Sequence, residues 1–144
     1  MFQLTTDGAP GLPHLTPRLT PRSLPVPHEN GRLFRQAWID GVTKHYPGEP
    51  RPGYVAPWAE MAEWEQAAAT AVYDQVAAFV KATGGATARL TREQRGRFVA
   101  LCWIGQIHRH FPDPKPSYLA DWEALPGWQR ETDADIFDRI EQAT

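Results

Sequence analysis

The sequence is poor in cysteine and in long apolar runs. Its 144 residues include one cysteine, Cys102, which cannot form an internal disulfide bond and which fits a reducing compartment. No apolar run approaches the roughly 18 residues that a membrane-spanning helix needs. Residues 1–30 also lack the apolar segment of a secretory signal peptide. We therefore expect a cytoplasmic protein that makes no membrane contact.

The sequence also has no marked excess of positive or negative charge. The chain has 15 Lys and Arg against 17 Asp and Glu, a formal net charge of −2. Proteins that bind nucleic acids mainly through the phosphates carry a marked positive charge, so this balance argues against a nucleic-acid partner. The aromatic content of 11% in turn excludes a wholly disordered chain.

Signatures of catalysis and of metal binding are absent from the sequence. It has no nucleophile motif, no glycine-rich phosphate loop and no HExxH pair. The nearest approach to a metal site is His108 with His110, but residues two apart do not share a helix face. Cys102 lies among apolar residues and is interpreted as a core residue, not a reactive thiolate. The sequence therefore predicts a protein that is not an enzyme and has no cofactor or metal.

Tryptophan and proline are abundant, with 6 and 14 residues. Six of the prolines lie within residues 1–30, where proline removes the amide donors that helices and sheets need. We expect an extended, Pro-rich N-terminal tail over residues 1–30, joined to a domain over residues 31–144. The alternative is that the tail is a docking arm for a partner protein or for a second copy of the chain.

The domain contains an internal repeat. Residues 31–48 align with 96–113, and residues 50–76 align with 114–140, with 13 identities in 45 pairs. All six tryptophans fall into aligned pairs, which are Trp38 with Trp103, Trp58 with Trp122, and Trp64 with Trp128. We name residues 31–83 the first copy and residues 90–144 the second copy. A module of this size is near the lower limit for folding alone. We therefore expect an all-α domain in which the two copies pack about a pseudo-twofold axis.

Each copy is predicted to fold as a helix, a Pro-rich arm and a second helix. Pro47 and Pro112 should end the first helix of each copy, because proline disfavours helical backbone at the residue before it. Thr91 with Gln94 forms a capping box for the first helix of the second copy, and Thr132 is predicted to cap its second helix. The predicted apolar face of the helix after Thr91 consists of Phe98, Leu101, Cys102, Trp103, Ile107 and Phe111.

The two arms carry candidate ligand contacts. Aromatic faces next to a cation can stack on a nucleotide and pair with its charge. The candidates are Arg51, Tyr54 and Trp58 in the first copy and Lys115, Tyr118 and Trp122 in the second. The alternative is that these aromatic side chains form the core of the repeat.

The helix that begins after Thr91 offers a second candidate site. Arg92 lies at the helix start, where free amides and arginine side chains together favour anions. The alternative is a solvated helix start in which Glu93 compensates the surrounding arginines. His110, in the last turn of the same helix, either stabilises the helix dipole or contacts a ligand.

The order of these elements resembles the ryanodine-receptor repeat, as found in small bacterial tandem-repeat proteins. The residues that carry the resemblance are His110-Phe111-Pro112, Trp122-Glu123-Ala124-Leu125-Pro126, Arg130, Asp133 and Ile140. The resemblance covers about residues 31–142. It implies an all-α fold of paired repeats and a non-enzymatic module that senses or sequesters a small, anionic or nucleotide-derived ligand. Arg130 joins the candidate ligand contacts on this basis. A homodimerisation or protein-interaction module using the Pro-rich tail is the alternative.

The first copy departs from this pattern. Gln66 and Ala69 align with Arg130 and Asp133, so the Arg-x-x-Asp spacing occurs in the second copy only. Either the first copy makes the same turn through the helix propensity of its alanines, or only the second copy keeps a binding site.

Overall fold

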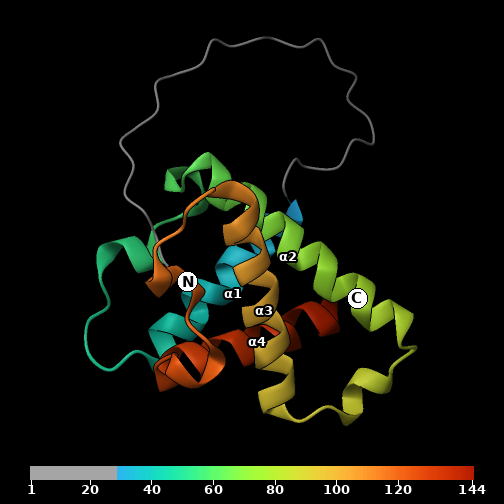
Figure 1. Cartoon of the computed structure of the whole chain (residues 1–144). Coiled ribbons are helices and arrows are strands. Elements are labelled where there is room, and N and C mark those ends of the chain that lie inside the picture. Colours follow the sequence, from blue (N-terminus) through green and yellow to red (C-terminus); the bar gives the residue numbers. More distant parts are fainter. Residues whose placement is uncertain (1–28) are drawn as a thin grey trace, which may run out of the picture.

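The computed structural model describes residues 29–144. They form four α-helices, α1 (Glu29–His45), α2 (Glu63–Ala82), α3 (Arg92–His110) and α4 (Gly127–Ala143) (Figure 1). No strand occurs among these residues, so the predicted all-α class is confirmed. The expected tail lies outside the described residues, except for Glu29 and Asn30, which begin α1. Within residues 29–144, no helix has both the length and the apolar character that a bilayer-spanning segment requires.

Short 3₁₀ helices interrupt both Pro-rich arms. Pro52–Val55 and Trp58–Glu60 lie between α1 and α2, and Pro116–Leu119 and Trp122–Ala124 lie between α3 and α4. A further 3₁₀ helix, Ala86–Arg89, joins α2 to α3. The arms are therefore not simply extended. Pro52 and Pro116 each begin a 3₁₀ helix, because the fixed φ of proline suits the first position of a helix.

The backbone of the two arms follows the same local path. Arg51 and the aligned Lys115 have φ/ψ angles of −64°/143° and −65°/142°. Ala56 and the aligned Ala120 have angles of −64°/140° and −62°/137°. The backbone therefore enters and leaves the first 3₁₀ helix of each arm at matching angles.

Most helix ends are those that the sequence predicts. α1 and α3 end at His45 and His110, two residues before a proline. The capping box is also confirmed, because the Gln94 amide donates to Thr91 Oγ1 at 3.1 Å and the Thr91 amide donates to Gln94 Oε1 at 2.9 Å. After α2, the chain turns at Gly85, whose φ of +95° favours glycine.

The prediction that Thr132 caps the last helix is wrong. α4 begins five residues earlier, at Gly127, directly after Pro126. Thr132 is buried in the middle of the helix, and its hydroxyl donates to the Trp128 carbonyl at 2.7 Å. A threonine followed by acidic residues is typical of a helix start. Here Trp128 and Thr132 contact Trp38 and Gly41 of α1, and this packing favours a helix that begins before Thr132.

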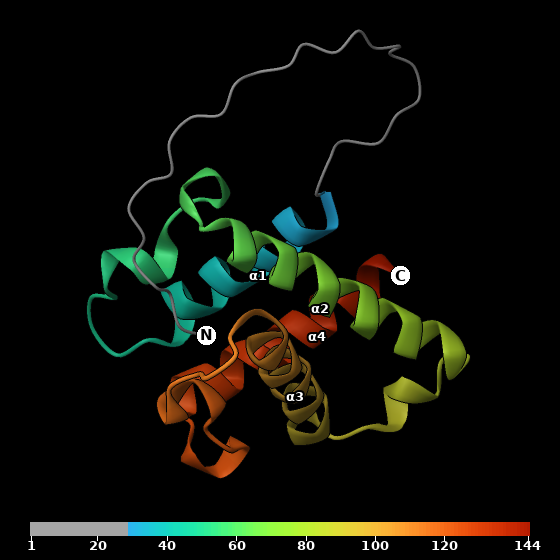
Figure 2. The ribbon, with the colours of Figure 1, turned by 45° about the horizontal axis from the view of Figure 1, so that its top comes forward.

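The core lies where α4 packs across α1 and α3 and α2 packs on α1 and α3 (Figure 1). Figure 2 looks nearly along α3 and shows α2 crossing above it. The side chains at the centre of the core are Phe34, Trp38, Val72, Ile107, Ile136 and Phe137. Close approach of α1 and α4 requires Gly41, because a Cβ there would lie 2.6 Å from Thr132 Cγ2.

The predicted apolar face of α3 is wrong at one position. Leu101 is 64% exposed, whereas Val99 and Trp103 are buried. Leu101 lies roughly 200° around the helix from Val99, at about 100° per residue. The buried stripe of α3 is therefore narrower than the run of apolar residues suggests.

Candidate functional site

The first arm is part of an aromatic cluster. The Tyr54 ring lies 5.5 Å from the ring of Trp128 in α4 and 5.9 Å from Tyr46. The Trp38 indole N–H donates to the Tyr54 carbonyl at 2.8 Å, and the Arg51 guanidinium lies 5.9 Å from the Tyr54 ring. Tyr54 is therefore held by packing on several sides, as the core interpretation of the arms predicts.

The second arm joins a separate cluster built from the aligned residues. Tyr118 lies 6.2 Å from Phe111, and Phe111 lies 4.9 Å from Trp64 of α2. Trp64 also contacts Trp103, at 6.1 Å between ring centroids. Each cluster thus receives a tryptophan from the other copy, Trp128 in one case and Trp64 in the other. Because the arms lie in different clusters, their aromatic residues do not form one shared site.

His110 belongs to this second cluster. Its ring lies 6.1 Å from Trp64, and within the described part of the chain its Nε2 has no hydrogen-bond partner. Burial, with the nearby charge of Arg109, lowers the pKa of His110. Lys115 is exposed on the arm. Neither residue lines the pocket that lies between the starts of α3 and α4.

Trp58 and Trp122 are buried at aligned positions, with 8% and 7% exposure. The Trp122 ring packs on Gly96, where an added Cβ would lie 2.5 Å from Cη2, and Trp58 packs on Gly31 in the same way. An arginine also covers each ring, since Arg97 lies 5.9 Å from Trp122 and Arg32 lies 5.7 Å from Trp58. Both indoles are therefore held in place by packing.

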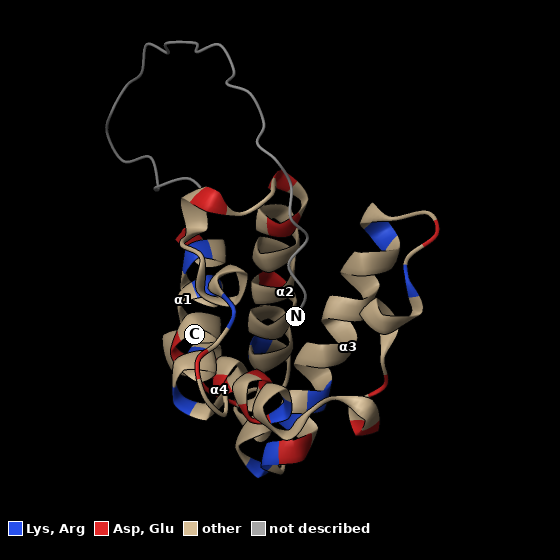
Figure 3. Cartoon of the chain, turned by 90° about the vertical axis from the view of Figure 1, so that its left-hand side faces the viewer, with Lys and Arg blue, Asp and Glu red and all other residues tan. Residues whose placement is uncertain are grey.

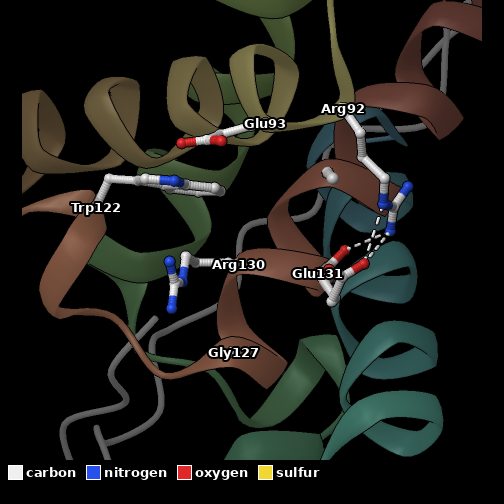
Figure 4. A pocket seen from close by; sticks show the side chains of 7 residues that line it. Arg92, Glu93, Trp122, Gly127, Arg130 and Glu131 are labelled. Atoms are coloured by element: carbon white, nitrogen blue, oxygen red, sulfur yellow. Dashed lines mark hydrogen bonds and ion pairs between the residues drawn. The ribbon is translucent and has the colours of Figure 1, made fainter.

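Three of the nine candidate residues line one pocket. It has a volume of about 350 Å³ and lies between the starts of α3 and α4. Figure 4 shows Trp122 between Glu93 and Arg130, with Arg92 paired to Glu131 on the other side. The lining consists of Arg92, Glu93, Trp122, Gly127, Arg130, Glu131 and Ala134.

Arg130 is the available cation of this pocket. Among residues 29–144 it forms no ion pair, and its buried Nε has no hydrogen-bond partner. Gly127 begins α4 beside it, and Pro126 at the N-cap provides no side-chain cap. Free amides and the positive end of the helix dipole therefore face the same space as the guanidinium.

Arg92, in contrast, is already paired. Its guanidinium lies 2.9 Å from Glu131, 2.7 Å from Asp135 and 3.4 Å from Asp138. Burial opposes ionisation of Asp135, but hydrogen bonds from Arg92 and His45 hold its pKa below the usual range. Arg92 therefore lines the pocket, and its ion pairs link α3 to α4.

The other arginines at the start of α3 are also compensated. Arg95 lies 2.9 Å from Asp138, and Arg97 lies 2.9 Å from both Glu93 and Glu123. Figure 3 shows blue and red segments interspersed near the ends of α3 and α4. This helix start therefore does not present the uncompensated positive charge that phosphate-backbone binding needs.

Sequence reasoning missed two buried charges in the first copy. Arg35 of α1 is 3% exposed and donates from Nε to the Ala56 carbonyl at 3.0 Å and from Nη2 to the Gly53 carbonyl at 3.1 Å. Glu65 of α2 is 1% exposed; burial raises its pKa to about 7, although the charge of Arg35 opposes the shift. The available signal was the position of Arg35, which falls between Phe34 and Trp38 on the apolar face of α1.

Asp133 is a third buried charge, in the second copy. It is 2% exposed, and burial raises its pKa to about 7. Arg130 and Asp133 form no ion pair with each other, although both lie in α4. The Arg-x-x-Asp spacing therefore places its two members in different environments.

Cys102 is partly buried, and burial raises the pKa of its thiol to about 11. The thiol is therefore protonated at neutral pH and has the low reactivity of a core cysteine. Across residues 29–144, no three His, Cys, Asp or Glu side chains are grouped as metal ligands.

Comparison of the chain with protein-family models, with curated proteins and with solved structures finds no match. The resemblance to the ryanodine-receptor repeat over about residues 31–142 therefore rests on the sequence alone.

Proposed function

We propose that this chain is a non-enzymatic, cytoplasmic module that binds a small anionic ligand, such as a nucleotide, in the pocket between the starts of α3 and α4. The observation that carries the proposal is the position of Arg130. Its guanidinium lies in the pocket without an ion pair from the described residues, next to the uncapped start of α4. A guanidinium and helix-terminal amides are the donors that phosphate and carboxylate groups prefer.

The size and lining of the pocket support a small ligand. A volume of about 350 Å³ lies at the lower end of the range typical for small-molecule sites. Trp122 supplies an apolar wall, against which a base or another flat group can pack. Glu93 and Glu131 also line the pocket, and Glu131 is paired with Arg92. The anionic end of the ligand therefore belongs on the Arg130 and Gly127 side.

We also infer that the two copies arose by duplication and are related by a pseudo-twofold axis. The aligned backbone angles of the arms support this interpretation, as do the reciprocal contacts of Trp64 and Trp128. The copies differ at the candidate site. Gln66, which aligns with Arg130, donates to the Trp58 carbonyl at 2.8 Å and so turns its polar group inward. This difference favours one ligand site, in the second copy.

The proposal is tested by thermal unfolding of the full chain with AMP, ATP and cyclic nucleotides, with adenosine as the uncharged control. A ligand at 100 times its Kd stabilises a protein by about 2.7 kcal/mol, which gives an easily measured rise in Tm. Arg130→Gln gives the second copy the residue of the first, so the variant should fold and lose the rise. The proposal fails if no phosphate compound raises the Tm, or if Arg130→Gln leaves the rise unchanged.

The homodimer alternative depends on the tail, which lies outside the described residues. Within residues 29–144, Leu101 is the exposed large apolar side chain on α3. One leucine covers far less than the roughly 800 Å² per partner of a standard interface. Light scattering of the full chain tests this alternative, since a monomer at high concentration contradicts it.

A further inference from the structure

The pocket between the starts of α3 and α4 has carboxylates as well as cations in its lining. Glu93 and Glu131 line it together with Arg92 and Arg130. The side chains of Glu93 and Glu131 are 62% and 52% exposed, so neither carboxylate is enclosed by its ion pair. A ligand in the pocket therefore meets groups of both signs.

The arginines around the pocket are shared between several carboxylates. Arg97 lies 2.9 Å from both Glu93 and Glu123, so it does not fully neutralise either of them. Arg92 is shared between three carboxylates of α4. Within residues 29–144, this network of ion pairs contains, together with Arg130, one more carboxylate than arginines. The arginines are Arg92, Arg95, Arg97 and Arg130, the carboxylates are Glu93, Glu123, Glu131, Asp135 and Asp138, and His45 is a further partner of Asp135. The nearby carboxylates therefore oppose a ligand that brings negative charge only.

The two signs lie on opposite sides of Trp122. Figure 4 shows the ring of Trp122 between Glu93 of α3 and Arg130 of α4. Arg130 lies beside Gly127, where the amides at the uncapped start of α4 also favour an anion. An anionic group at Arg130 and a cationic group at Glu93 are therefore joined by a part of the ligand that passes Trp122.

We propose that the ligand of this pocket is a zwitterion, whose anionic group binds Arg130 and the first amides of α4 and whose ammonium group binds Glu93. This inference rests on the function proposed above and narrows its class of ligand. An ammonium group donates three hydrogen bonds, and it supplies the positive charge that Glu93 otherwise shares with Glu123 through Arg97. A flat or apolar segment between the two charged ends packs along Trp122.

The test compares tyramine phosphate with 4-ethylphenyl phosphate, which has the same ring and phosphate but lacks the ammonium group. Calorimetric titration of the full chain at pH 7 and fixed ionic strength gives both affinities. We expect tyramine phosphate to bind at least fivefold more tightly, because it gains a charge-assisted hydrogen bond. A smaller preference overturns the inference. If neither compound binds while AMP does, the inference fails alone. If none of the three binds, the proposed function fails with it.

Two substitutions locate the ammonium contact. Glu93→Gln removes the carboxylate that lines the pocket, and Glu123→Gln is the matched control, because Glu123 pairs with the same Arg97 but does not belong to the pocket lining. The charge of Arg130 also reaches Glu123. The control can therefore change the affinity for both phosphates, but it should leave their ratio unchanged.

The ratio of the two affinities is the readout. It should fall to less than half of the parent value in Glu93→Gln and stay above half in Glu123→Gln. A ratio that stays above half in Glu93→Gln overturns the proposal. An equal fall in both variants also overturns it, because a general negative field would then explain the preference without a contact to Glu93.

A zwitterion of this kind can be a free molecule or the head group of a phosphatidylethanolamine lipid. The free molecule is favoured, because Leu101 is the exposed large apolar side chain among residues 29–144, and peripheral membrane binding needs an apolar or a strongly basic surface. Co-sedimentation with vesicles of phosphatidylethanolamine and phosphatidylcholine tests this choice. The chain should remain in the supernatant. Sedimentation that free tyramine phosphate reverses would indicate a lipid head group and overturn the assignment to a free molecule.

Discussion

The ring of Trp122 packs on the backbone of Gly96, so closely that a Cβ at Gly96 would lie 2.5 Å from Cη2 of the indole. The backbone N of Ala134 would lie 3.2 Å from the same Cβ. This contact fixes the start of α3 against the arm and against α4, and it forms one wall of the proposed ligand pocket. The aligned Gly31 and Trp58 repeat it in the first copy.

Gly96→Ala is therefore expected to destabilise the protein. Overpacking costs roughly 1–3 kcal/mol, and the higher helix propensity of alanine offsets up to about 1 kcal/mol of that. Gly105→Ala lies in the same helix with nothing within 4 Å of its Cβ, so it should stabilise by up to about 1 kcal/mol. Urea unfolding of the two variants measures the difference. Equal effects of the same sign would contradict the packing of Trp122 on Gly96.

Asp133 should make stability fall as the pH rises. Burial raises the pKa of Asp133 to about 7 in the folded state, against about 3.9 in the unfolded chain. The folded state therefore holds the proton more tightly, so this stability is complete below about pH 4 and is lost as the pH rises through 7. The difference amounts to at most about 4 kcal/mol.

Asp133→Asn removes this titration. We expect the variant to gain stability over the parent at pH 8 and to differ little at pH 4.5. Glu65, whose pKa is also raised to about 7 by burial, leaves a residual slope in the variant. Urea midpoints at the two pH values measure the effect, and a gain that is the same at both would rule out titration of Asp133 as its source.

Much of the fold could be predicted from local sequence signals. Pro47 and Pro112 each lie two residues after the end of a helix, α1 or α3, and so predict where it ends. Thr91 with Gln94 predicts the start of α3. These signals act through the backbone of neighbouring residues, so they do not depend on tertiary contacts. Thr132 shows the limit of such reasoning, since its cap-like sequence lies inside a helix that tertiary packing extends to Gly127.

The candidate site was only partly predictable for the same reason. The sequence predicts Arg92, Trp122 and Arg130 as ligand contacts, and these three residues line one pocket. The sequence does not indicate that carboxylates of α4 pair with Arg92 while Arg130 forms no ion pair with any of residues 29–144. The pairings of Arg92 join residues about 40 positions apart. The sequence places Asp133 in a motif, but its burial depends on how α4 packs against α3.

Arg35 and Glu65 should behave as a coupled pair. Arg35→Ala removes the guanidinium whose charge acts on the buried Glu65 carboxylate, and removing one partner of a buried pair typically costs about 3–5 kcal/mol. Adding Glu65→Gln gives the first copy the Ala and Gln that the second copy has at these positions, and it should recover at least half of that loss. A double-mutant cycle in urea at pH 8 measures the coupling. Additive effects of the two substitutions would show that the charges do not interact.

Substitutions of the two pocket arginines, Arg92 and Arg130, should affect stability and ligand binding differently. Arg92→Gln removes three ion pairs between α3 and α4, and each partly exposed pair contributes about 0.2–1 kcal/mol. This variant should unfold at lower urea and bind AMP within threefold of the parent. Arg130→Gln should show the reverse, because it removes no ion pair from the described residues but takes away the cation of the pocket. Its AMP affinity should fall at least tenfold, with a small change in the urea midpoint. Calorimetric titration of AMP at fixed ionic strength gives both affinities. If Arg92→Gln loses AMP binding and Arg130→Gln does not, the anion contact lies at the start of α3 and not at Arg130.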